Sequence, residues 1–304
     1  SARYFVPLLG LGLLVFLRPF RRKQVQWFAL GLILSTMVLL PILPHLFSKE
    51  ARLRFEEVNI FTDSSVVLLA NERQAYDNQS LLGRVLHNRR IGYARSYLLH
   101  FFDHFDPQFL FVRGDGNPKF SIQDVGQLYM IEFPLLVMGV YWVLSRHKKV
   151  GLLLLYWLIA AIIPAAVARE TPHALRIENS LPTWHIFIAA GIVWLMEILR
   201  SKTLRRSVVA LIILLYVLNV SYYLHNYYTH YPLEYSGEWQ YGYREALAYI
   251  QPIKSQYSRV YMTESIGRPH MYTLFYEKVD PKIYMQTKRS YFDAAGFYHV
   301  SGFG

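Results

Sequence analysis

The stretch SVVALIILLYVLNVSYYL, residues 207–224, decides the fold class, because its 18 residues include no charged side chain. An α-helix needs roughly 20 apolar residues to cross a bilayer core about 30 Å thick. Four other stretches come close to that length, and a sixth, at the very start, is shorter. The six predicted spans are residues 4–17, 25–47, 128–144, 150–168, 181–199 and 207–224. Ser1 rather than Met precedes the first, so we expect a truncated helix at the start of a fragment.

The short connections between these spans are strongly basic. Residues 18–23, 145–149 and 200–206 carry four, three and four positive charges and no acidic residue. The remaining connections are balanced, and the two kinds alternate along the chain. Because lysine and arginine collect in cytoplasmic loops, this alternation predicts that the long loops and the C-terminus lie outside. The sequence therefore predicts an α-helical polytopic protein of the cell membrane, with multiple passes.

The net charge of the chain is +11, which by itself also suits a nucleic-acid-binding protein. The three basic loops account for all of this charge, and the rest of the chain is neutral. Only 17% of the residues are charged and 53% are hydrophobic. We therefore expect a membrane-lipid environment and no nucleic-acid partner. With no cysteine, disulfides and thiol chemistry are excluded for this chain.

Four regions follow from these spans. We predict two transmembrane helices in residues 1–47, an outer loop domain in 48–127, four transmembrane helices in 128–224 and an outer C-terminal domain in 225–304. In the outer loop, residues 81–86 and 93–101 have apolar residues near helical spacing. The tail is predicted to be a small α/β unit, with helices over 239–251 and 269–279 and a strand over 259–263.

The segment RETPHALRIENS, residues 169–180, is the strongest candidate for a binding site. Arg169, His173 and Arg176 are spaced four and three apart, so one helical turn would place them on one face. Guanidinium groups suit a phosphate, and ionisable groups at the mouth of a membrane helix are costly unless they are paired or used. We predict a phosphate or pyrophosphate site here; the alternative is a solvated loop with internal ion pairs.

Three smaller features accompany this segment. Glu132 and His185 lie about one turn inside their spans, where they either line a cavity or reach into the head groups. The cluster GDGNP, residues 114–118, is interpreted as a tight turn. Asp115 and Asn117 are the only candidate ligands for a divalent cation, and one carboxylate makes a poor calcium site. No catalytic motif such as HExxH or GxSxG occurs.

Five motifs in order resemble those of one protein family. They are RFEEVNIFTD (54–63), LLGRVLHNRR (81–90), HFDPQFLFVRGDGNP (104–118), GQLYMIEFPLLVMG (126–139) and RETPHALRIENSLP (169–182). The series looks like the C-terminal half of bacterial membrane glycosyltransferases related to protein O-mannosyltransferases and the lipid A aminoarabinose transferase. The resemblance covers residues 54–284 and implies the C-type glycosyltransferase fold.

The resemblance implies transfer of a sugar from a polyprenyl-phosphate donor to an acceptor, protein, lipid or glycan, on the outer face. In that family the acidic catalytic residue lies in the first outer loop, which would stand upstream of residue 1. The fragment alone would then be inactive, and its contribution would be donor-phosphate binding by Arg169, His173 and Arg176. Two alternatives remain: a secondary transporter, and a non-catalytic membrane scaffold whose outer domain binds glycans.

Overall fold

The computed structural model describes residues 2–17, 22–42, 44, 48, 58–293 and 298–303. Arg18 and Arg21 of the first basic loop and residues 54–57 of the first motif lie outside the described residues. The described chain is mostly helical and contains one small two-stranded sheet. It divides into two compact units, Ser1–Tyr223 and Leu224–Gly304, which are taken separately below.

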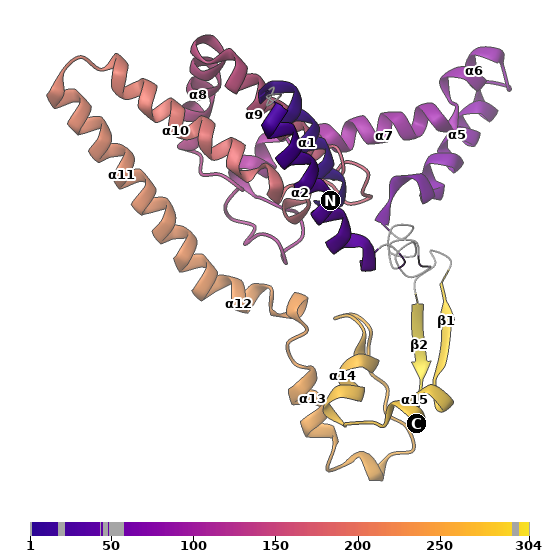
Figure 1. Ribbon diagram of the computed structural model, residues 1–304. Helices are drawn as coiled ribbons and strands as arrows, with labels where there is room; N and C mark the ends of the chain where they lie inside the picture. Colours follow the sequence, from indigo (N-terminus) through magenta and orange to yellow (C-terminus); the bar gives the residue numbers. More distant parts are fainter. Residues whose placement is uncertain are drawn as a thin grey trace. The chain divides into compact units, whose positions relative to one another are not determined.

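Three helical segments are long and apolar enough to cross a membrane: Val25–Ile42, Glu178–Ile198 and Lys202–Glu234. They contain helices α2 (Arg22–Leu39), α10 (Leu181–Ile198) and α11 (Lys202–His225). Helices are thus confirmed in three of the predicted stretches, residues 25–47, 181–199 and 207–224. Helix α1 (Ala2–Leu17) is apolar but shorter, and Figure 1 shows it beside α9.

The predicted limits of the spans 128–144 and 150–168 are wrong. Helix α8 runs from Glu132 to Arg146 and α9 from Lys148 to Ile162, 15 residues each, or about 22 Å at 1.5 Å per residue. The first helix starts late because residues 128–131 form a turn, in which the Glu132 carboxylate accepts the Tyr129 N–H at 2.7 Å. The second ends early because Pro164 follows closely, and a proline has no N–H to continue the helical hydrogen bonds.

Helices α8 and α10 pack backbone against backbone. A Cβ atom placed on Gly139 of α8 would overlap the Phe187 carbonyl oxygen of α10, and one on Gly191 would overlap the Leu135 carbonyl oxygen. Small residues at such crossings allow helices to approach closely, which is how helices associate where the hydrophobic effect is weak. The fully buried Phe187 lies in this interface. Two glycines therefore fix how α10 lies on α8.

Helix α9 joins the same assembly from the other side and also carries α1. Phe5 of α1 is buried against Ala160 and Ala161 of α9. The Tyr156 hydroxyl donates a hydrogen bond to the Leu8 carbonyl oxygen. Gly12 lies where the Tyr156 ring leaves no room for a Cβ atom. The apolar N-terminal helix is thus held by specific contacts as well as by its composition.

The described part of the long loop predicted over residues 48–127 is largely helical. It contains α5 (Ser64–Tyr76), α6 (Leu81–Leu86), α7 (Arg89–Asp103) and a π-helical turn, Gln108–Val112. Asp63, Ser80 and Asn88 cap the three α-helices through their side-chain oxygens, each accepting a backbone N–H near the helix start. The helical pattern predicted over residues 81–86 and 93–101 is confirmed. Phe109, Leu110 and Phe111 of the π-helical turn belong to one core with α8, α9 and α10.

The C-terminal unit combines short helices with a hairpin. Its helices are α12 (Tyr231–Glu234), α13 (Tyr243–Ile250), α14 (Pro269–Tyr276) and α15 (Pro281–Thr287). Strands β1 (Arg289–Phe292) and β2 (Tyr298–Gly302) pair antiparallel. The coarse prediction of helices with a little sheet is confirmed, but the strand predicted over 259–263 is wrong, because these residues are irregular.

The helices of this unit are shorter than predicted. Gln240 at φ 55° and Gly242 at φ 105° have left-handed backbone conformations, so the helix predicted over 239–251 begins only at Tyr243. Lys278 at φ 52° likewise lies beyond the helix that ends at Tyr276. Left-handed residues break a right-handed helix.

Replacing Gly139 by alanine tests the contact between α8 and α10. We expect Gly139→Ala to lower the free energy of unfolding by about 1–3 kcal/mol, because the methyl group forces the two backbones apart. Gly31→Ala in α2 is the matched control, since nothing lies within 4 Å of its Cβ position. Alanine favours a helix over glycine by about 1 kcal/mol, so the control is expected to be neutral or stabilising. Thermal unfolding in detergent measures both; equal melting temperatures for the two variants would contradict the contact.

Candidate functional site

The segment 169–180 is anchored to residues 58–62, just before α5. Asn59 and Ala168 form an isolated antiparallel bridge, and the Arg169 N–H donates to the Val58 carbonyl oxygen at 2.8 Å. The Arg169 side chain continues this contact: Nε donates to the Asn59 carbonyl oxygen at 3.1 Å and Nη2 to the Thr62 hydroxyl at 2.9 Å. Arg169 therefore holds two chain segments together.

His173 is buried between the GDGNP turn and the end of α7. Its Nδ1 lies 3.7 Å from Asp115 Oδ2, and its ring is 4.5 Å from the Phe120 ring, centre to centre. The His173 N–H donates to His104 Nε2 at 3.3 Å. The Ala174 N–H donates to Asp115 Oδ2 at 2.7 Å. Two distant parts of the sequence thus meet at this histidine.

The GDGNP cluster forms the turn that its sequence indicates. Asp115 Oδ1 accepts the Asn117 N–H at 2.9 Å, and Asn117 Oδ1 accepts the Lys119 N–H at 3.0 Å. Only 3% of Asp115 is exposed, and its second oxygen receives the Ala174 N–H. The described residues contain no group of three or more acidic or histidine side chains placed to hold a metal ion. The carboxylate considered for a cation instead links the turn to residues 173–174.

His104 is a buried neutral base at the centre of these contacts. It is fully buried, and its Nδ1 lies 2.7 Å from the His100 carbonyl oxygen. Because a carbonyl oxygen only accepts, Nδ1 carries the proton and Nε2 is the acceptor for the His173 N–H. Burial lowers the pKa of His104 below its usual value. Burial, reinforced by the nearby Arg176 charge, also lowers the pKa of His173.

Arg176 follows His173 on a 3-10 turn, Ala174–Arg176, and a second 3-10 turn, Glu178–Ser180, leads into α10. The single helical turn predicted to align Arg169, His173 and Arg176 is therefore wrong. The structure brings Arg176 close to His173 and places Arg169 against Asn59 and Thr62 instead. Arg176 is half-buried, and its Nη1 donates to the Glu170 carbonyl oxygen at 3.0 Å.

Glu132 and His185 occupy separate places. Glu132 is buried, with Oε2 accepting the Tyr129 N–H and Oε1 accepting the Tyr216 hydroxyl of α11 at 2.9 Å. His185 is exposed, and its Nδ1 lies 2.8 Å from the Leu181 carbonyl oxygen within α10. Glu132 thus joins two helices, and neither residue borders the cavity described next.

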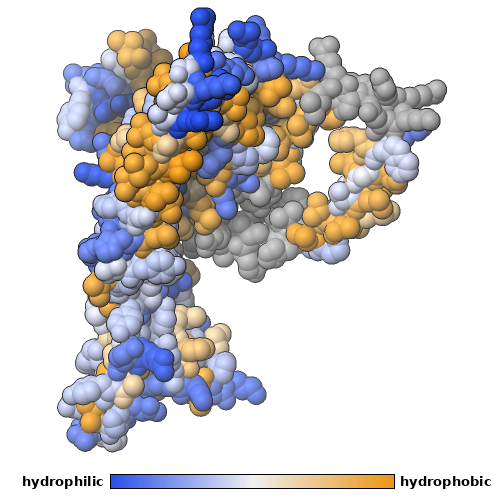
Figure 2. All heavy atoms as spheres, turned by 90° about the vertical axis from the view of Figure 1, so that its left-hand side faces the viewer, coloured by the Kyte–Doolittle hydropathy of each residue, from blue (hydrophilic) through white to orange (hydrophobic). Residues whose placement is uncertain are grey.

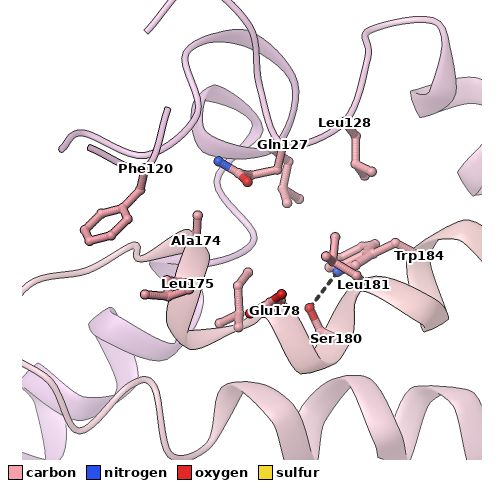
Figure 3. Close-up of a pocket in the computed structure, with 11 residues that line it drawn as sticks. Phe120, Gln127, Leu128, Ala174, Leu175, Glu178, Ser180, Leu181 and Trp184 are labelled. Carbon is pink, nitrogen blue, oxygen red and sulfur yellow. Dashed lines mark hydrogen bonds between the residues drawn. The ribbon is translucent and has the colours of Figure 1, made fainter. Parts of the chain in front are cut away.

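A cavity of about 230 Å³ lies beside the two 3-10 turns (Figure 3). Its walls come from the π-helical turn, residues 120–128, the 3-10 turns and the start of α10. The lining residues are Leu110, Phe120, Gln127, Leu128, Ala174, Leu175, Ile177, Glu178, Ser180, Leu181 and Trp184. Residues 127–128 reach it because their N–H groups donate to the Phe109 and Leu110 carbonyl oxygens.

Sequence reasoning missed His104, Gln127 and Trp184. Glu178 lies in the charged segment 169–180, so the sequence predicted a site in this segment without assigning a role to Glu178 itself. His104 and Gln127 carry no spacing signal, because they reach residues 173–178 through contacts across about 50 to 70 positions of sequence. Comparison with models of protein families, with curated proteins and with solved structures finds no match to this chain.

The buried histidines predict sensitivity to acid. Both folded-state pKa values lie below the unfolded value of about 6.5, so the unfolded chain binds more protons as the pH falls. The free energy of unfolding is then expected to decrease below about pH 6.5, by at most about 1.4 kcal/mol per pH unit for each proton. Melting temperatures between pH 7.5 and pH 5 measure this loss. His173→Phe should reduce the pH slope, and the exposed control His185→Phe should leave it unchanged; the reverse result would refute the assignment.

Proposed function

We propose that this chain is the C-terminal part of a polytopic membrane glycosyltransferase. The enzyme would move a sugar from a polyprenyl-phosphate donor to an acceptor on the outer face of the membrane. The bond from the sugar C1 to a phosphate oxygen breaks, a bond from C1 to an acceptor oxygen forms, and the acceptor proton passes to a base upstream of residue 1. The resemblance of the five motifs supports this reaction, and the following features support the placement.

Exposed apolar surface supports a membrane environment. In α2 and α11, none of the most apolar 18 residues is buried within the protein. Val38 of α2 is 75% exposed, and Ile213 and Leu218 of α11 are more than half exposed. Figure 2 shows a broad apolar patch on the visible face, bordered by hydrophilic residues. Water-soluble monomers rarely expose contiguous apolar patches of more than a few hundred Å², whereas lipid chains cover such surfaces without cost.

Charge supports the proposed orientation. The connections at residues 145–149 and 200–206 are basic, so we place them in the cytoplasm. The loop 169–180, the helices of the outer loop and the C-terminal unit then lie outside. In this arrangement α8 and α9, which are short for a bilayer crossing, reach the outer surface through the turns at residues 128–131 and 163–168.

The position of Arg176 is the observation that carries the donor-phosphate site. It lies in the loop between α9 and α10, five residues before α10 begins, so the proposed orientation puts it at the outer side of two apolar helices. A polyprenyl phosphate needs a fixed cation at this boundary, because its chain stays in lipid while its phosphate becomes more charged as the sugar leaves. The hydrogen bond to the Glu170 carbonyl oxygen fixes the guanidinium. His173, in its neutral form, and Arg169 would stabilise the loop that carries Arg176.

The positions of the acidic groups favour this enzyme over a secondary transporter. Transporters place ionisable groups and broken helices near the bilayer midplane. Here Glu132 lies in the first turn of α8, and Glu197 is the next-to-last residue of α10. A glycan-binding scaffold remains the other candidate, and transferase activity of the full-length protein separates it from the enzyme.

The orientation can be tested by labelling single cysteines, since this chain has none of its own. In the full-length protein, with any other cysteine replaced, we expect Gln79→Cys and Ser265→Cys to react with a membrane-impermeant maleimide in intact cells. Ser145→Cys and Ser201→Cys are expected to react only after permeabilisation. All four side chains are exposed in the structure. Labelling of Ser201→Cys in intact cells would overturn the orientation.

Removing the Arg176 charge tests the phosphate site. In the full-length enzyme we expect Arg176→Ala to weaken binding of the polyprenyl-phosphate sugar and to reduce kcat/KM by about 100-fold or more, as loss of a charge-stabilising donor does elsewhere. Arg113→Ala is the matched control, because Arg113 is exposed and, among the described residues, only its backbone takes part in hydrogen bonds. Unchanged turnover and donor affinity in Arg176→Ala would refute the site.

A further inference from the structure

Two polar side chains at the cavity beside the 3-10 turns have no internal role. Among the described residues, no hydrogen bond engages the side-chain amide of Gln127 or the side-chain carboxylate of Glu178, although both residues line the cavity. Figure 3 shows them on opposite walls of the cavity, Gln127 in residues 120–128 and Glu178 in the second 3-10 turn. Polar groups placed in this way at an apolar cavity usually fix the orientation of a ligand.

The remaining walls are apolar and partly aromatic. Trp184 is 7% exposed, and its Nε1 donates to the Ser180 hydroxyl at 3.1 Å, which fixes the indole plane. Phe120 closes another side and is itself supported by the buried His173 ring. Aromatic walls suit the C–H faces of a sugar ring, and an amide and a carboxylate suit its hydroxyls, which both donate and accept hydrogen bonds.

The charge and the size of the cavity limit which ligands it can hold. The Glu178 carboxylate disfavours an anion, so this cavity is unsuited to a phosphate group. Arg176 is not among its lining residues; its neighbours Leu175 and Ile177 are. The volume of about 230 Å³ is below the roughly 300–1,000 Å³ of sites that enclose a drug-sized molecule. A single neutral ring fits these limits.

We propose that this cavity binds one neutral hexose unit of the substrate. The Gln127 amide and the Glu178 carboxylate hold its hydroxyls, and Trp184 and Phe120 contact its apolar faces. The inference rests on the proposed function for the identity of the larger substrate, but the binding itself does not depend on a polyprenyl phosphate. The sugar and the phosphate would then be held on two sides of one short loop, residues 174–178.

Direct binding to simple glycosides tests the cavity. Methyl hexopyranosides of mannose, glucose and galactose configuration are titrated against the full-length protein in detergent, with saturation-transfer NMR as the readout. We expect at least one to bind, and Gln127→Ala and Glu178→Ala each to weaken it about tenfold or more. Gln108→Ala and Glu170→Ala are matched controls, since both side chains are exposed and neither lines the cavity. The controls are expected to stay within about twofold of the unsubstituted protein.

The outcomes separate this inference from the proposed function. Equal glycoside binding in all four variants, or no glycoside binding at all, overturns the hexose site. Displacement of the glycoside by a sugar-free polyprenol, unaffected by Gln127→Ala and Glu178→Ala, also overturns it, because an isoprenoid then fills the cavity. Glycoside binding that is weakened by Gln127→Ala and Glu178→Ala supports the hexose site. If polyprenyl-phosphate binding is at the same time unchanged by Arg176→Ala, the phosphate site is refuted.

Discussion

The contact between α8 and α10 at Gly139 and Gly191 is the constraint on which the helical unit Ser1–Tyr223 depends. Because the two backbones touch, the start of α10 is held at a fixed height beside the start of α8. Trp184 and Leu181, in the first turn of α10, therefore face the core residues of the π-helical turn. Any side chain larger than hydrogen at either glycine would move this end of α10 and with it one wall of the cavity.

Asp115 plays the corresponding role in the long loop before α8. Its carboxylate accepts N–H groups from Asn117, within its own turn, and from Ala174, and it lies beside His173. Burying a carboxylate is costly unless such partners compensate it, so the turn and the 173–176 segment stabilise each other. The loop between α9 and α10 consequently has a defined backbone. This backbone sets the directions of the Arg176 and Glu178 side chains.

The opposite charges of Arg176 and Glu178 suit different ligands, although both residues belong to the loop between α9 and α10. A guanidinium and a carboxylate two residues apart would neutralise each other if they faced the same ligand. The short 3-10 turns instead direct Glu178 toward the cavity, while Arg176 reaches the Glu170 carbonyl oxygen. Under the proposed function, one loop would therefore hold a phosphate and an uncharged sugar, the two parts of a polyprenyl-phosphate sugar.

The sequence by itself determined the apolar helices within residues 25–47, 181–199 and 207–224 and the GDGNP turn, because hydropathy and turn chemistry act between near neighbours. Only the tertiary structure decided that α8 begins at Glu132 and that His173 is buried while Arg169 ties two segments together. It also decided that Gln127 and Glu178 line one cavity. The predicted strand at 259–263 failed for the same reason. Strands pair, and sites form, between segments that can be distant along the chain. The pattern within one segment does not indicate which other segment it will contact.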